Sequence, residues 1–199
     1  LHLHSEYSLL DGACRIKELV LRVKELGQKA VAVTDHGNMF AAVEFYNECL
    51  AQGIKPIIGC EVYVAPRTRF DKLAKIDSSP YHLVLLCENN EGYQNLIKLV
   101  SAAYTEGFYS KPRVDVELLE KYHKGLICLS ACLAGEIPRK LTNGDYEGAK
   151  QTALKYRDIF GRDNYFIELQ NHKFADQQRI LPMLIKLSRE TGIPMDCTN

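Results

Sequence analysis

The sequence predicts an α/β fold in which helices cover a mostly parallel sheet. Short, continuously apolar runs such as AVAVT at residues 30–34 alternate with longer stretches, such as residues 15–26, whose apolar residues recur at helical spacing. Strands that are apolar on both faces are typical of sheets buried between helices. The pattern alone leaves open a closed barrel and an open, doubly wound sheet.

The expected strands are short and separated by helices or polar loops. We expect strands at residues 1–4, 30–34, 57–65, 82–87, 125–130, 165–169 and 193–198. Residues 67–80 and 107–114 are polar and are expected to form loops. No GxGxxG or P-loop turn follows any strand, which argues against a dinucleotide or Walker-type nucleotide site.

Five helices are expected from the spacing of apolar residues and from end signals. We expect them at residues 15–26, 39–52, 92–104, 145–160 and 176–191. Gly27 and Gly53 follow the first two and can end them, whereas Asp145 is a suitable N-cap. Pro182 is expected to delay or kink the last helix.

Composition is that of one globular domain. The 199 residues are 46% hydrophobic and carry 25 Lys and Arg against 25 Asp and Glu, so the formal net charge is zero. Neutrality argues against a strong electrostatic hold on nucleic acid by this chain alone. No apolar run approaches the ~18–20 residues of a membrane span, and no leader peptide is evident. Seven cysteines without a CxxC pair favour reduced thiols, so a cytoplasmic protein without membrane contact is expected.

Chemically capable side chains gather where the expected strands end. His2 and His4 stand two residues apart in the expected first strand, so their side chains share one face of it. Further candidates follow or lie within later strands. The candidate metal ligands are His2, His4, Asp11, His36, Glu61, His82 and Cys132. Each one alone has a plainer interpretation as a turn, core or boundary residue, but an unpaired carboxylate at Glu61 within an apolar strand would be costly.

The position of His82 does not fit the simple picture, because it begins its strand rather than ending it. Either that strand boundary is shifted or the side chain reaches in from a neighbouring loop. In parallel α/β folds the functional site lies at the carboxyl ends of the strands.

A mixed set of nitrogen, oxygen and sulfur ligands suits Zn²⁺, Mn²⁺ or Fe²⁺. Seven ligands are too many for one tetrahedral ion, so two or three divalent ions are expected. Clustered divalent ions are suited to phosphoester hydrolysis, because they activate water near neutral pH and neutralise the charged phosphate oxygens. We expect no catalytic side chain separate from the metal ligands.

The motifs that carry these residues resemble the PHP (polymerase and histidinol phosphatase) domain family. The resemblance rests first on HLHSEYSLLDG at residues 2–12, TDHG at 34–37 and GCE at 59–61. A narrower resemblance, to PHP domains at the N-terminus of alpha subunits of bacterial DNA polymerase III, rests on four more motifs. These are YHLVLL at 81–86, GYQNL at 92–96, GFYSKPR at 107–113 and GLICLSACLAGEI at 125–137.

The resemblance implies a distorted (β/α)7 barrel with a metal cluster at the C-terminal ends of its strands. Seven of nine ligand positions match. The other two would follow the pair Thr198-Asn199, so residues 1–199 are expected to be a PHP domain truncated at both ends, a fragment of a longer polymerase chain.

Intact sites of this family are associated with 3′→5′ exonuclease activity, which implies a proofreading role in DNA replication. The parent chain would be a DNA-directed DNA polymerase, a nucleotidyltransferase that uses Mg²⁺. Implied partners are the 3′ end of the primer strand, the rest of the alpha chain and other replisome subunits. Two alternatives remain open: a catalytically silent, metal-stabilised structural module, and a free-standing phosphatase of the histidinol-phosphatase type.

Several polar residues are peripheral candidates. His172 lies near the end of the sixth strand, and Asp35 is either peripheral to the site or a cap for the next helix. Phosphate contacts are considered for Arg67, Arg69, Lys111 and Arg113, with solvated loops as the alternative interpretation.

Overall fold

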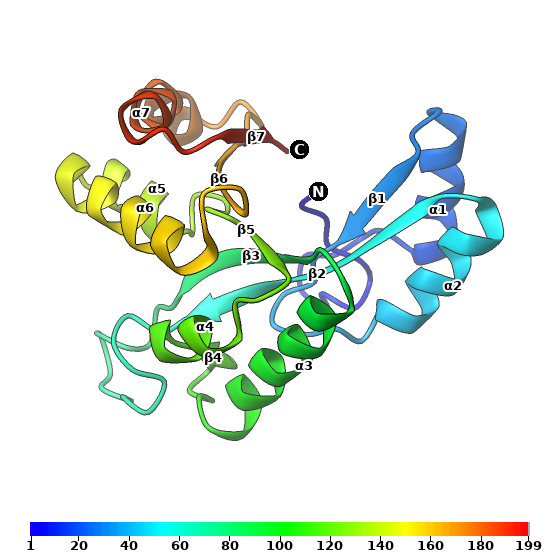
Figure 1. Cartoon of the computed structure of the whole chain (residues 1–199), viewed down its shortest axis with the longest axis horizontal. Coiled ribbons are helices and arrows are strands. Elements are labelled where there is room, and N and C mark those ends of the chain that lie inside the picture. The colour runs from blue at the N-terminus through cyan, green and yellow to red at the C-terminus, as the bar shows by residue number, and fades with distance from the viewer. Residues whose placement is uncertain (199) are drawn as a thin grey trace.

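A strongly curled, seven-stranded mixed sheet forms the centre of the computed structural model, which describes residues 1–198 (Figure 1). The strand order is β1-β2-β3-β5-β6-β7. Strand β4 pairs with the last two residues of β2, on the part of that strand that β1 does not reach. The strands are β1 (Ala30–Val33), β2 (Lys55–Val64), β3 (Tyr81–Cys87), β4 (Arg113–Val114), β5 (Leu126–Leu129), β6 (Tyr165–Leu169) and β7 (Met195–Cys197). The predicted α/β fold with a barrel-type sheet is confirmed as a curled half-barrel.

Strand β3 is the exception in an otherwise parallel sheet. It runs antiparallel to both β2 and β5, and His82 pairs with Tyr63. No helix connects β2 to β3, so β3 begins beside the carboxyl end of β2 and runs back along it. The amino end of β3 therefore lies with the carboxyl ends of its parallel neighbours. This reversal explains why His82 lies at the same end of the sheet as the other candidate ligands although it is at the start of its strand.

The predicted helices are present, and two short ones were missed. The helices are α1 (Ile16–Glu25), α2 (Ala42–Gln52), α3 (Asn90–Thr105), α4 (Val116–Tyr122), α5 (Glu136–Thr142), α6 (Tyr146–Phe160) and α7 (Ala175–Thr191). Helices α4 and α5 span seven residues each, which is too short for a helical period to stand out. Asp145 caps α6 as predicted, and Pro182 lies inside α7 without ending it.

The prediction of a first strand at residues 1–4 is wrong. This segment is irregular, but it lies beside the end of β1. The Thr34 amide donates to the Leu3 carbonyl at 2.8 Å, and the Leu3 amide donates to the Thr34 hydroxyl oxygen at 2.8 Å. The amino-terminal segment is thus bound to the sheet edge without continuing its ladder.

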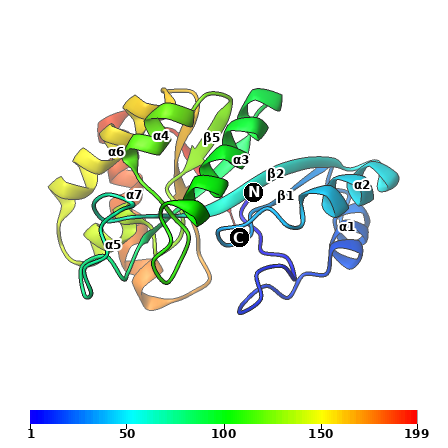
Figure 2. The same cartoon turned by 90° about the horizontal axis from the view of Figure 1, so that it is seen from below.

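Apolar side chains pack on both faces of the sheet. One large cluster lies between the sheet and helices α3 to α7, and a second joins α1 and α2 to β1. Figure 2 shows α1 and α2 at one end of the molecule, well apart from α4 to α7 at the other. A small third cluster lines what we call the inner face, and includes Ala32, Val84 and Leu129 from three strands. Since Glu61 pairs with Val84, its side chain points to this inner face.

The long loop between β2 and β3 is fastened by two buried arginines. Arg113 is 0% exposed and donates to the backbone carbonyls of Gly107, Asp77, Arg69 and Asp71. Arg69 is also buried and is ion-paired with Asp115, Glu106 and Glu117. The prediction that Arg69 and Arg113 contact phosphate is therefore wrong, because their donors are used within the fold.

Replacing Arg113 by Met should destabilise the protein by about 3 kcal/mol, because several buried carbonyl oxygens lose their donor. Urea unfolding followed by circular dichroism measures this change. Arg162→Met removes an exposed arginine and should change the stability by less than about 0.5 kcal/mol. Equal unfolding midpoints for the two variants would contradict the structural role of Arg113.

Candidate metal centre

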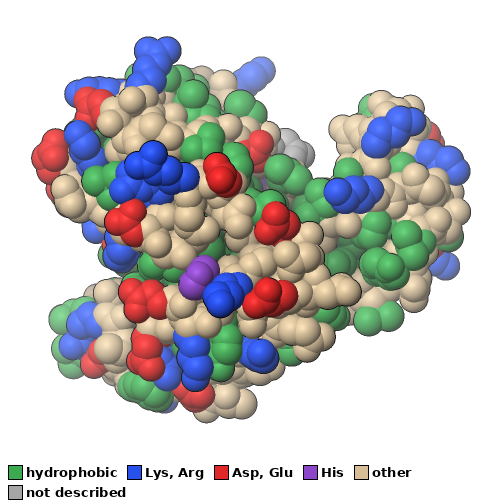
Figure 3. Space-filling model, in the orientation of Figure 1, with side chains coloured by type: hydrophobic (Ala, Val, Ile, Leu, Met, Phe, Trp, Pro, Cys, Tyr) green, Lys and Arg blue, Asp and Glu red, His purple; other side chains and the backbone are tan. Residues whose placement is uncertain are grey.

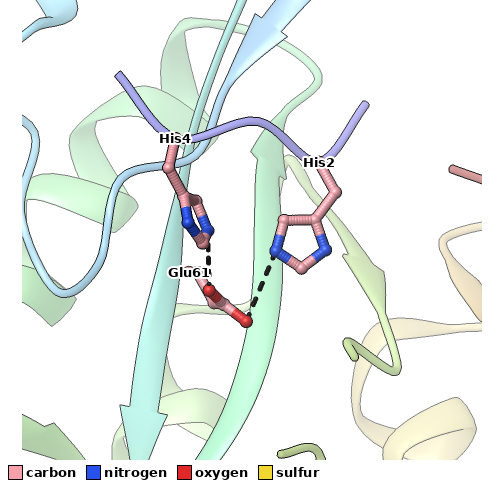
Figure 4. A group of neighbouring side chains, drawn as sticks. All are labelled: His2, His4 and Glu61. Atoms are coloured by element: carbon pink, nitrogen blue, oxygen red, sulfur yellow. Dashed lines mark ion pairs between the residues drawn. The ribbon is translucent and has the colours of Figure 1, made fainter. Parts of the chain in front are cut away.

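A buried carboxylate surrounded by imidazoles occupies the inner face of the sheet. Glu61 projects from β2 and has no exposed surface. His36 follows β1, His82 begins β3, and His2 and His4 come from the amino-terminal segment. Figure 4 shows His2 and His4 pointing toward the two carboxylate oxygens of Glu61. Three segments far apart in sequence thus deliver their side chains to one residue.

The distances are those of a compact cluster. Oε2 of Glu61 lies 2.9 Å from His4 Nε2 and 2.9 Å from His36 Nδ1. Oε1 of the same residue lies 2.9 Å from His82 Nδ1 and 3.4 Å from His2 Nε2. Asp11, which is half-exposed, extends the cluster outward, with Oδ2 at 2.9 Å from His36 Nε2.

These side chains form three overlapping groups in which one potential ligand atom per residue lies within 4.8 Å of the others. The groups are His2, His4 and Glu61; His4, Asp11 and His36; and His36, Glu61 and His82. Six of the seven predicted ligands are therefore together.

A glycine allows the turn that carries His36 to approach β2. The Gly37 amide donates to the Glu61 carbonyl at 2.9 Å, so the turn extends the β1–β2 pairing. Gly37 has a φ of 62°, and a Cβ there would lie 2.9 Å from Pro112 and 3.0 Å from Tyr63. A larger residue would push His36 away from the cluster.

Asp35 holds the amino-terminal loop in place. Its buried carboxylate accepts three hydrogen bonds of 2.7 Å, from the Ser5 amide, the Ser5 hydroxyl and the Ser8 hydroxyl. It caps no helix, so that interpretation is wrong. Because these bonds join the loop after β1 to the segment that carries His2 and His4, Asp35 supports the cluster from behind.

The imidazoles and carboxylates change one another's protonation. Burial raises the pKa of Glu61, but the close contacts with the four surrounding histidines outweigh burial and hold it well below its ordinary value. Burial lowers the pKa of His2, yet hydrogen bonds with Glu168 and Glu61 raise it to about 10. For His36 too, Glu61 and Asp11 outweigh burial and raise the pKa. A cation bound here must displace protons.

Three buried atoms at the centre fit a divalent cation. His4 Nε2 and His36 Nδ1 each lie 2.9 Å from Glu61 Oε2, but none of the three atoms has an aligned hydrogen-bond partner within residues 1–198. Buried polar atoms are normally hydrogen-bonded. Nitrogen and carboxylate lone pairs that converge without a partner are what a Zn²⁺, Mn²⁺ or Fe²⁺ ion requires.

Two other predicted site residues, Cys132 and His172, belong to none of these three groups. Cys132 Sγ is 3.6 Å from Glu61 Oε1, and burial raises the pKa of its thiol to about 12. His172 is exposed and contacts Gln177 rather than the cluster. Asn199, half of the expected closing pair, lies outside the described residues.

Sequence reasoning missed Glu168. This buried residue lies in β6, and its Oε1 is 2.7 Å from His2 Nδ1 and accepts a hydrogen bond from Gln170 at 2.8 Å. Its other oxygen, Oε2, has no hydrogen-bond partner among the described residues. The signal was available, because Glu168 is a carboxylate inside an apolar strand, as is Glu61. Together they hold His2 between two carboxylates.

The remaining basic candidates differ in availability. Arg67 is half-exposed, but its guanidinium is ion-paired with buried Asp77 and with Asp71. Lys111 Nζ lies 5.3 Å from the ring centroid of Tyr63, which stacks on His36. Lys111 is thus the predicted phosphate contact that stands at the edge of the cluster.

Comparisons with known proteins agree with this geometry. Residues 1–172 match the PHP domain family. The whole chain is 54% identical to part of the DNA polymerase III subunit alpha of Treponema pallidum, and 46% identical to part of that of Thermus aquaticus. The chain spans only 17% of the length of each of these relatives.

Among solved structures, an amidohydrolase from Chromobacterium violaceum is similar in fold, with a TM-score of 0.58 and 14% identity. The likeness covers the whole of this chain and 87% of that one. No helix in residues 1–198 is both long enough and apolar enough to cross a membrane.

Binding of Zn²⁺ or Mn²⁺ to the metal-free protein at pH 7 should release at least one proton, because the raised pKa of His2, about 10, keeps its ring protonated. Affinity should therefore rise as the pH rises from 6 toward the pKa of His2. Calorimetric titration in buffers of different ionisation enthalpy counts the protons. A binding heat that is the same in every buffer would contradict the prediction.

Proposed function

Because the chain belongs to the PHP domain family, we propose that it is the PHP domain of a bacterial replicative polymerase alpha subunit and a metal-dependent phosphoesterase. Its reaction is the 3′→5′ removal of nucleotides from a primer strand. The observation that carries the phosphoesterase proposal is the convergence of His4 Nε2, His36 Nδ1 and Glu61 Oε2, which are buried and have no hydrogen-bond partner in the described part of the chain.

The proposed metal ligands are the seven predicted residues, which would share two or three ions. They are His2, His4, Asp11, His36, Glu61, His82 and Cys132. When bound, divalent ions at such a centre lower the pKa of water and neutralise the oxygens of a phosphodiester. Glu61, buried and ionised, supplies the central negative charge that allows several ions to approach one another.

In the proposed reaction, water adds to the last phosphorus and the bond from that phosphorus to the 3′ oxygen of the preceding nucleotide breaks. The products are a nucleoside 5′-monophosphate and a strand shorter by one nucleotide with a free 3′ hydroxyl, to which a proton from the water passes. Lys111, whose Nζ lies over the Tyr63 ring at the edge of the cluster, would contact a phosphate oxygen.

The polymerase context is supported by identity of about one half to alpha subunits along the whole chain. In that context the chain is one PHP domain of a longer polymerase, which would use Mg²⁺ at a separate polymerase centre. The other partners would be the rest of the alpha chain and replisome subunits, in the cytoplasm.

The test is 3′-end shortening of a 5′-labelled primer–template with a mismatched 3′ terminus, by the intact protein with Mn²⁺, Zn²⁺ or a chelator. We expect metal-dependent shortening that His4→Ala lowers at least tenfold, since even residues that merely orient metal ligands contribute about 10–100-fold. His123→Ala, which changes a histidine outside the cluster, should retain activity.

Absence of shortening by protein shown to contain metal would overturn the exonuclease proposal and favour the structural module. Release of phosphate from small phosphomonoesters, without action on DNA, would instead favour the free-standing phosphatase.

A further inference from the structure

A pocket of about 430 Å³ opens directly beside the metal centre. Asp11, His36 and His82 of the centre line one side of it. The other side is largely apolar, and we call the whole cavity the apolar pocket. The rest of its lining includes Leu9, Leu10, Phe40, Tyr63, Tyr104 and Lys111. The volume is in the range of small-molecule sites, about 300–1,000 Å³.

The apolar pocket displays large hydrophobic side chains to solvent. Leu9 is 89% exposed, Leu10 is 92% exposed and Phe40 is 69% exposed. Adjacent exposed apolar residues beside polar groups mark binding sites. Tyr104 is 43% exposed and adds an aromatic surface.

The leucines are held in place by the structure of their loop. Ser8 bonds to the Asp35 carboxylate, and the amides of Asp11 and Gly12 both donate to the Ser8 carbonyl. A Cβ at Gly12 would lie 1.8 Å from the Ser5 carbonyl oxygen, so the turn closes tightly on itself. Leu9 and Leu10 therefore stand at the tip of a closed turn beside the metal centre.

Tyr63 forms the boundary between the apolar pocket and the metal centre. Its ring stacks on His36 with centroids 6.0 Å apart and meets His82 edge-on at 5.1 Å. Lys111 Nζ lies 5.3 Å from the same ring, and Pro112 packs against the turn at Gly37. One positive charge thus stands where the apolar walls end and the metal-binding side chains begin.

We propose that the apolar pocket receives the base of the 3′-terminal nucleotide, unstacked from its strand, while Lys111 contacts the phosphate next to it. The inference rests on the proposed function and adds to it a preference for the kind of 3′ end that is bound. Aromatic and aliphatic walls accept any base without reading its sequence, and stacking on such walls is worth about 1–3 kcal/mol per base. A paired base cannot enter, so a mismatched or frayed end, which costs least to unstack, is preferred.

The test measures binding, with metal removed by a chelator so that no strand is cut. Fluorescence anisotropy compares the intact protein's affinity for two single-stranded oligonucleotides, one ending in a normal nucleotide and one whose last residue lacks its base. We expect about tenfold tighter binding of the strand that keeps its terminal base. Leu10→Ala and Phe40→Ala should reduce this preference at least threefold. Leu26→Ala removes an exposed leucine outside the pocket and should preserve it.

Equal affinity for the two oligonucleotides, or a preference that survives in both pocket variants, would overturn the proposal. Failure of the proposed function is a separate result, since it would be seen as no metal-dependent shortening of either strand. A preference for the base that depends on Leu10 and Phe40 would support the pocket whatever the rate of cleavage.

Discussion

The burial of Glu61 is the constraint on which the rest of the site depends. A carboxylate with no exposed surface inside an apolar sheet is stable only when cationic or hydrogen-bonding groups surround it. His4, His36 and His82 satisfy this need, each at 2.9 Å from one of its oxygens. Because these histidines come from three separate segments, their attraction to one carboxylate also joins the amino-terminal segment, the end of β1 and the start of β3.

The same arrangement that stabilises the fold prepares the site for metal. Without a cation, protons on His2 and His36 balance the carboxylates, as their raised pKa values show. A cation bound at this cluster would replace those protons, so that the negative charge of Glu61 would be balanced in either state. Asp35 and Glu168 support the cluster from behind, because Asp35 accepts a hydrogen bond from the Ser5 amide and Glu168 pairs with His2.

The basic residues illustrate how burial separates structural from functional charge. Arg69 and Arg113 belong to segments rich in positive charge, yet both are buried. Carboxylates surround the guanidinium of Arg69, and backbone carbonyls accept the hydrogen bonds of Arg113. Lys111 is only two residues from Arg113 but lies over Tyr63 at the edge of the metal centre. The arginines fix the loops that present the lysine. Charge that can meet a substrate is therefore much scarcer than composition suggests.

Local sequence determined most of the helices and strands and most candidate ligands, because apolar periodicity, strand-end histidines and a carboxylate within an apolar strand are all local signals. It wrongly predicted a strand at residues 1–4 and missed the short strand β4. It left open a barrel or an open sheet, and it missed the short helices α4 and α5, whose seven residues contain too little periodicity. Only the tertiary structure decided that β3 runs backward and so delivers His82, that Glu168 holds His2, and that Arg113 is buried. Strand direction and burial arise from pairings between residues distant in sequence, which no local pattern encodes.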